Sequence, residues 1–197
     1  MFISPSHANC VITRELDARP SREHHPDLHG DVLMVIAAAM NRGRDAVLKV
    51  ALLIVLELTR GTTAAISIVH KRLAGDLLVW EGTAGSDAEL LQGELPFYSG
   101  PCGYALEVKD AQLFADPSSH FDSIPLLVPP ILEMLVVPVF DSGQPWGALA
   151  VCMSGHRKLL DREDARQLKM VGEYTMAALA AMERLPRCYG TAHQFRQ

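Results

Sequence analysis

The sequence has no excess of basic residues. Its 197 residues include 18 Lys and Arg against 23 Asp and Glu, a formal net charge of −5. Proteins that bind nucleic acid normally present a basic patch or stripe to the phosphates. The charge balance therefore argues against a nucleic-acid partner. The remaining composition, 49% hydrophobic and 21% charged, is that of a globular chain long enough to bury one core.

Long apolar runs are also missing. The longest apolar stretch, residues 46–58, is interrupted by Lys49 and Glu57. A helix that crosses a bilayer needs about 20 predominantly apolar residues, so this stretch predicts a buried helix instead. The N-terminus lacks the basic start and apolar core of a secretory signal. We expect no membrane association and a cytoplasmic location.

Cysteines are few and widely spaced. Cys10, Cys102, Cys152 and Cys188 form no CxxC pair, which predicts reduced thiols with neither a disulfide framework nor a zinc knuckle. We expect Cys10 and Cys188 to lie in tails and the other two in the fold. The histidines at 24, 25 and 29 show no spacing that fixes a metal geometry, so no metal site is expected.

Several catalytic and signalling motifs are absent as well. The sequence contains no phosphate-cradling glycine loop, no nucleotide-binding motif, no histidine-kinase box and no catalytic Ser-His-Asp order. It also shows no output domain. If the protein is a sensor, its signal must pass to a separate output protein.

What is present divides the chain into three parts. Residues 1–30 carry three prolines and no sustained hydrophobic period, which predicts a flexible lead-in. Residues 31–185 alternate helical and strand patterns and are expected to form one domain. Residues 186–197, beginning at Pro186, are expected to be a frayed C-terminal tail.

Within the domain, hydrophobic periods predict helices at the two ends and strands between them. The expected helices are 31–40, 45–59, 102–107 and 161–185, and the expected strands are 62–70, 76–81, 112–115, 134–140 and 146–153. Strands paired as hairpins, with helices grouped at both ends of the chain, indicate an antiparallel sheet with helices packed on one face. The predicted fold class is therefore α+β.

Three of these elements carry signals about their surroundings. The helix at 45–59 is apolar on nearly every side, which predicts two burial partners, the sheet and a second chain. Pro138 lacks the N–H that a central strand donates, so it predicts an edge or a bulge. Asp161 is suited to cap the N-terminus of the last helix, and the charge of Asp164 suits the helix dipole there.

Five segments, taken together, resemble the GAF domain family in their order and spacing. They are 60–68 (RGTTAAISI), 95–103 (LPFYSGPCG), 130–139 (PILEMLVVPV), 146–151 (WGALAV) and 161–164 (DRED). The likeness covers roughly residues 31–185 and is to GAF domains that precede bacterial sensor histidine kinases or exist alone.

The resemblance implies a sheet of about five or six antiparallel strands. The N- and C-terminal helices would lie on one face, and the long loop region would cover a small-molecule pocket on the other. It further implies a stand-alone sensory domain that binds an unidentified small molecule and signals through a homodimer of its terminal helices. Because one fold serves many functions, the site has to be argued residue by residue.

Cys102 is the first candidate site residue. It lies at the expected start of a short helix, where the helix dipole stabilises a thiolate and would favour nucleophilic or redox chemistry. Alternatively, Cys102 packs as a small apolar residue under the loop. The first interpretation gains from a resemblance to the free methionine sulfoxide reductases, GAF enzymes with a Cys-Gly element like Cys102-Gly103 and a carboxylate placed like Glu133.

The enzyme resemblance is incomplete. Those reductases carry a further cysteine in the loop before the carboxylate, whereas residues 121–127 here read FDSIPLL. The sulfenic acid formed when a sulfoxide is reduced is normally resolved by a nearby thiol. A thiol-dependent redox enzyme that uses Cys102 is therefore the alternative, and a non-enzymatic sensor is the preferred interpretation.

Other GAF subclasses lack their key residues here. Phytochrome-like bilin carriers have a Cys-His pair where this chain has Cys102-Gly103, and the residue signature of cyclic-nucleotide GAF domains is absent. His120 has the chemistry of an axial haem ligand, but a single loop histidine is more often a solvated or capping residue. No cofactor is identified.

The candidate ligand site combines aromatic and polar side chains of the loop region. Its predicted members are Trp80, Cys102, Tyr104, Asp116, His120, Phe121 and Glu133. Apolar walls with a few polar anchors are typical of small-ligand pockets. Two plainer interpretations stay open: the aromatic residues seal the loops onto the sheet as core, and Glu133 caps loop amides.

Overall fold

A single six-stranded antiparallel sheet is the centre of the computed structural model, which describes residues 9–20, 22, 28–86, 88, 93–155 and 159–184. The strands are β1 (Thr63–His70), β2 (Leu77–Gly85), β3 (Glu94–Pro96), β4 (Gln112–Ala115), β5 (Ile131–Asp141) and β6 (Gln144–Ser154). Their order across the sheet is β3-β2-β1-β6-β5-β4. The predicted α+β class and antiparallel pairing are confirmed. The three-residue edge strand β3 was not predicted.

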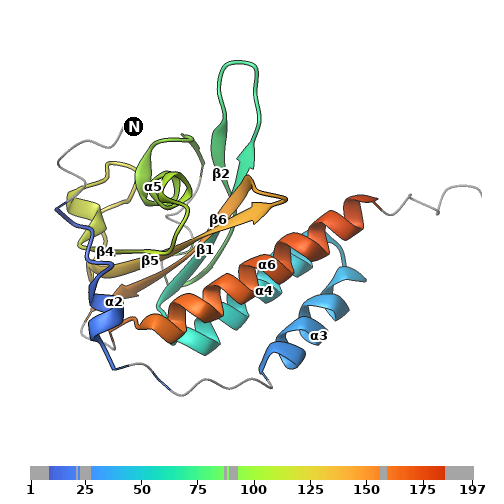
Figure 1. Ribbon diagram of the computed structural model, residues 1–197, viewed down its shortest axis with the longest axis horizontal. Coiled ribbons are helices and arrows are strands. Elements are labelled where there is room, and N and C mark those ends of the chain that lie inside the picture. The colour runs from blue at the N-terminus through green and yellow to red at the C-terminus, as the bar shows by residue number, and fades with distance from the viewer. Residues whose placement is uncertain are drawn as a thin grey trace, which may run out of the picture.

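The helices form two unequal groups on opposite faces of the sheet (Figure 1). They are α2 (Glu15–Ala18), α3 (Leu28–Met40), α4 (Arg44–Thr59), α5 (Gly100–Val108), the 3₁₀ turn η2 (Pro117–Ser119) and α6 (Arg162–Arg184). Helices α4 and α6 cover one face, and α3 packs on the outside of these two helices; this side is here called the helix face. Helix α5 and its flanking loops cover the other, the loop face.

Alternation along the strands divides the core between these two faces. On β5, Leu135 and Val137 join the core of the helix face, and Met134 and Val136 join the core of the loop face. Successive side chains of a strand point to opposite sides, so one strand serves both cores. The sheet therefore separates the two cores and contributes side chains to both.

Helix α4 is buried within its own chain. It packs against α3, α6, β1 and β2, and Val47, Leu48, Ala51, Leu52 and Val55 are buried. Part of the apolar surround that the sequence analysis assigned to the sheet and a second chain is thus covered by α3 and α6. Leu53 is 50% exposed, so the second chain expected on this helix stays a prediction.

Pro138 lies where the sheet has a local edge. The first residue of β4, Gln112, pairs with Val136 of β5. Beyond Val136, β5 therefore has no neighbour on the β4 side. The opposite side of Pro138 pairs with Ala148 of β6. The expected edge position is confirmed. The β5–β6 turn is shorter than predicted: Ser142 and Gly143 form it with positive φ angles of 49° and 80°, as a two-residue hairpin requires.

The segment before α3 is part of the folded structure. Cys10 is only 1% exposed, and the Ile12 N–H donates to the Leu113 carbonyl of β4 at 2.8 Å. The flexible lead-in predicted for residues 1–30 is therefore wrong for residues 9–20 and 22, and for Cys10 in particular. The edge of β4 offers backbone groups that this short segment satisfies, a partnership invisible in its local pattern. His24, His25 and Cys188 lie outside the described residues.

Candidate functional site

Cys102 lies in the first turn of α5, as the sequence predicts, and its thiol is buried. The residue is 4% exposed, and burial raises the pKa of the thiol to about 12, although a hydrogen bond with the Ser67 side chain acts in the opposite direction. Loss of solvent disfavours the charged thiolate more than the short helix favours it. The thiol is therefore protonated at neutral pH.

Gly103 allows α5 to approach the preceding loop. A Cβ at this position would lie 2.1 Å from the carbonyl oxygen of Phe97, far inside van der Waals contact. The Cys-Gly pair thus has a packing role in this chain. It places the Cys102 side chain against the sheet while the backbone of Gly103 faces Phe97.

Four of the predicted site residues meet on the loop face. Tyr104 stacks edge-on against Phe114 at a centroid distance of 5.6 Å, and Phe114 does the same with Phe121 at 5.5 Å. Trp80, from β2, packs against the same core as Cys102. Trp80 and Tyr104 are half-buried, whereas Phe121 is buried. The loop face therefore combines sealed core with two partly accessible aromatic rings.

Asp116 and His120 flank the η2 turn beside this core. Asp116 is exposed and adopts a left-handed backbone with φ of 44°. His120 is half-buried, and its Nδ1 lies 3.1 Å from the Asp116 carbonyl oxygen. This contact makes His120 a local partner of the turn, with its ring near the surface. Both residues lie close to Phe121 in the chain, at the rim of the loop face.

Glu133 is not brought together with Cys102. Its Oε1 and Oε2 accept hydrogen bonds from the two Arg19 guanidinium nitrogens at 2.7 and 3.1 Å, and Oε2 also accepts from the Leu160 N–H at 3.0 Å. The Arg19 guanidinium further donates to the Leu160 carbonyl at 2.7 Å. Glu133 thus joins the N-terminal segment to the loop before α6, matching the loop-amide interpretation.

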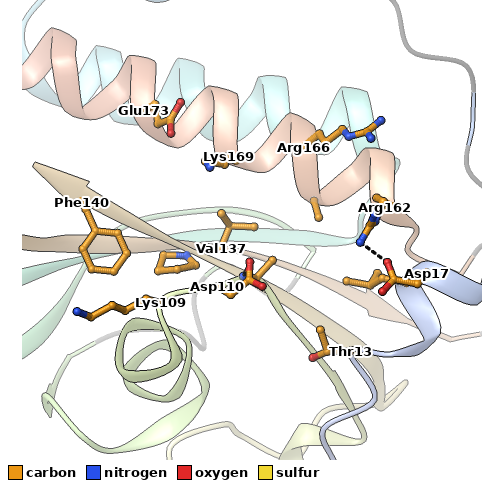
Figure 2. Close-up of a pocket in the computed structure, with 14 residues that line it drawn as sticks. Thr13, Asp17, Lys109, Asp110, Val137, Phe140, Arg162, Arg166, Lys169 and Glu173 are labelled. Atoms are coloured by element: carbon orange, nitrogen blue, oxygen red, sulfur yellow. Dashed lines mark hydrogen bonds and ion pairs between the residues drawn. The ribbon is translucent and has the colours of Figure 1, made fainter. Parts of the chain in front are cut away.

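A cavity of about 410 Å³ lies between α6 and the sheet, at the free edge of β5 (Figure 2). We call it the edge groove. Its apolar lining is Leu16, Ala111, Val137, Pro138, Phe140 and Ala165. Its polar and charged lining is Thr13, Asp17, Lys109, Asp110, Arg162, Arg166, Lys169 and Glu173. Sequence reasoning missed this groove because its residues come from four segments that only the fold brings together.

Within the described ranges, no group of three or more His, Cys, Asp or Glu side chains could hold a metal ion. Among the same residues, no helix has both the length and the apolar character to span a bilayer.

Comparison with solved structures finds the same fold in GAF proteins. The GAF domain of an Acinetobacter phosphoenolpyruvate-protein phosphotransferase aligns with a TM-score of 0.65 and 15% identity, over 83% of this chain and 99% of that one. A free methionine-R-sulfoxide reductase from Neisseria meningitidis, in complex with its substrate, aligns with a TM-score of 0.62 and 22% identity, over 84% of this chain and 96% of that one. These identities establish the fold alone.

A GAF domain from the Coxiella burnetii phosphoenolpyruvate-protein phosphotransferase aligns similarly, with a TM-score of 0.62 and 16% identity over 79% of this chain and 94% of that one. No match is found among curated proteins. The family model of the GAF domain matches residues 41–180. This span includes the whole sheet and most of the helix face, and the protein therefore belongs to the GAF domain family.

Proposed function

We propose that this protein is a sensory GAF domain that binds a small molecule on its loop face and signals through a homodimer of its terminal helices. The observation that carries the proposal is the division of the core by a single sheet. Residues such as Met134 and Leu135 are neighbours in β5 yet belong to the loop-face and helix-face cores respectively. A ligand that shifts the strands would therefore repack the helices.

The proposed ligand site contains six of the seven predicted residues. Trp80 and Tyr104 supply partly accessible aromatic surface, Cys102 and Phe121 the buried wall, and Asp116 with His120 the polar rim. Glu133 is left out, because Arg19 and the Leu160 amide occupy its carboxylate. The ligand class stays open in this proposal.

The exposed surface of α3 supports the dimer. Leu33, Met34 and Val35 are 47%, 70% and 50% exposed, and Ala37 and Ala38 are exposed beside them. Contiguous apolar surface of this kind commonly marks a protein–protein interface. The patch lies on a terminal helix of the GAF domain, so a second copy docked there would be in contact with the helix layer that responds to the sheet. A separate output protein would then read the state of the dimer.

Native mass spectrometry of freshly purified protein tests both halves of the proposal. We expect a dimer mass with an added small molecule, and loss of that added mass in Tyr104→Ala. Tyr174→Ala is the matched control, since Tyr174 packs against the helix-face core. An unliganded monomer at micromolar concentration would contradict the proposal.

The redox alternative is not favoured. A reactive cysteine needs an accessible thiolate, whereas Cys102 is buried and its pKa is raised to about 12. The similarity to the Neisseria reductase concerns the fold, at 22% identity.

A further inference from the structure

The edge groove exists because β5 extends beyond the last residue that pairs with β4. From Val137 onward β5 has no partner strand on this side, since β4 ends opposite Val136. Pro138 offers no N–H to an added strand, so this edge is poorly suited to extend the sheet. A cavity of about 410 Å³ is within the size range of small-ligand sites. A small molecule fits this edge better than a peptide strand.

The walls of the groove come from four elements with defined local reasons. Lys109 follows α5 in a left-handed conformation with φ of 62°, which turns the chain so that Lys109 and Asp110 both reach the groove. Helix α6 presents Lys169 and Glu173 from successive turns above it. Figure 2 shows Lys109 and Phe140 at one end of the groove and the Arg162–Asp17 ion pair at the other.

The charged side chains of the groove that form no ion pair are equal in number for the two signs. Arg162 is paired with Asp17, and Arg166 is paired with Glu163 at 3.4 Å. The remaining charged groups are Lys109, Lys169, Asp110 and Glu173. None of these four forms an ion pair with another residue in the described part of the chain. The groove thus presents two cations and two anions that form no ion pair in the described part of the chain, and of these the Asp110 carboxylate accepts a hydrogen bond from the Ala111 N–H at 2.8 Å.

Between these charges the groove has an apolar floor. Val137 is 2% exposed and Leu16 is 5% exposed, and Phe140 is half-buried at the end near Lys109. Apolar surface flanked by unpaired charges of both signs is complementary to a molecule with the same pattern.

We propose that the edge groove binds a small zwitterion with an apolar side group, chemically a free amino acid. Its carboxylate would contact Lys169 and Lys109, its ammonium would contact Asp110 and Glu173, and its side group would lie on Phe140 and Val137. This site is distinct from the ligand site proposed on the loop face, although Lys109 follows α5 and Phe140 packs against the loop-face core. Because α6 forms one wall of the groove, the bound zwitterion contacts the helix layer directly. Its effect on the helices would not depend on a shift of the strands.

Fluorine NMR with para-trifluoromethyl-phenylalanine as the probe tests this proposal. Two comparators remove one charge each: the N-acetyl derivative retains only the carboxylate, and the carboxamide retains only the ammonium. We expect each comparator to bind about threefold to tenfold more weakly than the zwitterion, since the contacts are charged but exposed.

Matched variants assign the probe to the groove. Lys169→Gln should weaken binding of the zwitterion part of the way towards the affinity of the carboxamide, because Lys109 remains. Asp110→Asn should weaken it part of the way towards the affinity of the N-acetyl derivative, because Glu173 remains. Lys49→Gln, an exposed change on α4, should leave all three affinities unchanged. Thermal unfolding establishes that each variant is folded.

Three results would overturn the proposal. They are no binding of the zwitterion at millimolar concentration, equal affinity for all three compounds, and an unchanged response in Lys169→Gln and Asp110→Asn. Tyr104→Ala, which targets the loop face, should not alter binding of the probe. This last arm separates the groove from the ligand site of the proposed function.

Discussion

At the scale of single residues, the chemistry of Cys102 depends on its surroundings more than on its place in a helix. The sequence correctly predicts a cysteine in the first turn of α5, where a helix dipole favours a thiolate. Burial under the loops acts against the dipole, and the pKa of the thiol is raised to about 12. Dipole effects at a helix end amount to about 1 kcal/mol or less, whereas full desolvation shifts a pKa by several units.

This burial predicts a pH-dependent loss of stability. Above pH 9 the unfolded thiol ionises while the folded one stays protonated, so the unfolded state binds fewer protons and stability falls as pH rises towards 12. Each pH unit in this window costs at most about 1.4 kcal/mol. Urea unfolding between pH 8 and 11 should show a steeper loss for the wild type than for Cys102→Ala. Parallel curves would show that Cys102 does not titrate in this way.

The same buried thiol predicts no reductase activity. Loss of free methionine sulfoxide, measured with a thiol reductant, should proceed at the same background rate with the wild type and Cys102→Ser. A rate that depends on Cys102 would instead support the redox alternative.

Gly103 offers a second test at this scale. Gly103→Ala places a methyl group 2.1 Å from the Phe97 carbonyl oxygen, and forcing backbone apart commonly costs about 1–3 kcal/mol. Gly30→Ala is the control, because nothing lies within 4 Å of the added carbon in α3. We expect the control to stabilise the protein by about 0.5–1 kcal/mol. Chemical denaturation reports both changes, and equal stability of the two variants would refute the packing role.

At the scale of elements, the segment of residues 9–20 is held to the domain by backbone pairing and by Arg19. The Arg19 side chain bridges Glu133 of β5 and the Leu160 carbonyl before α6. The start of α6 is closed by reciprocal bonds, Asp161 N–H to Asp164 and Asp164 N–H to Asp161, at 2.8 and 2.9 Å. The Asp161 cap is expected from the sequence, and the bond from the Asp161 N–H to Asp164 completes a capping box that was not predicted. Arg22 adds a cation to the same two carboxylates.

Removing Arg19 should leave a buried carboxylate without its partner. Glu133 is 5% exposed, and breaking a buried pair from one side costs about 3–5 kcal/mol. We expect Arg19→Met to lower the free energy of unfolding by about 3 kcal/mol and to expose residues 9–20 to proteolysis. The double variant Arg19→Met with Glu133→Met should recover part of this loss. Arg14→Met, at an exposed position, should have an effect below about 0.5 kcal/mol.

At the scale of the whole molecule, the outer surface of the helix face carries an apolar patch. The helix face ends in the apolar patch of Leu33, Met34 and Val35 on α3, which we propose as the dimer contact. Although α3 and α6 cover much of α4, Leu53 of α4 is also 50% exposed; the α3 patch is chosen because its apolar residues are adjacent.

A charge placed in that patch should shift the oligomeric state. Met34 is 70% exposed in one chain, so Met34→Glu should fold normally and place a desolvated charge in a dimer interface. We expect a shift from dimer to monomer in light scattering at micromolar concentration. Val108→Glu is the control, because Val108 is 43% exposed on α5 of the opposite face. The same mass for wild type and Met34→Glu would rule out this patch as the interface.

The sequence by itself determined the family, the α+β class and most element positions. These properties are local or repeat along the chain: hydrophobic periods, turn residues and caps act over a few residues. Strand β4 was predicted with its observed bounds, and β3 was missed because three edge residues ending in Pro96 carry too little pattern.

Only the tertiary structure decided which side chains meet. It placed Glu133 against Arg19 and away from Cys102, joined residues 9–12 to the edge of β4, and assembled the edge groove from distant segments. Contacts between residues far apart in the chain depend on strand order and register, which a local pattern does not specify. For the same reason, the sequence predicted the position of Cys102 at the start of a helix, but the direction of its pKa shift depends on the residues that bury it.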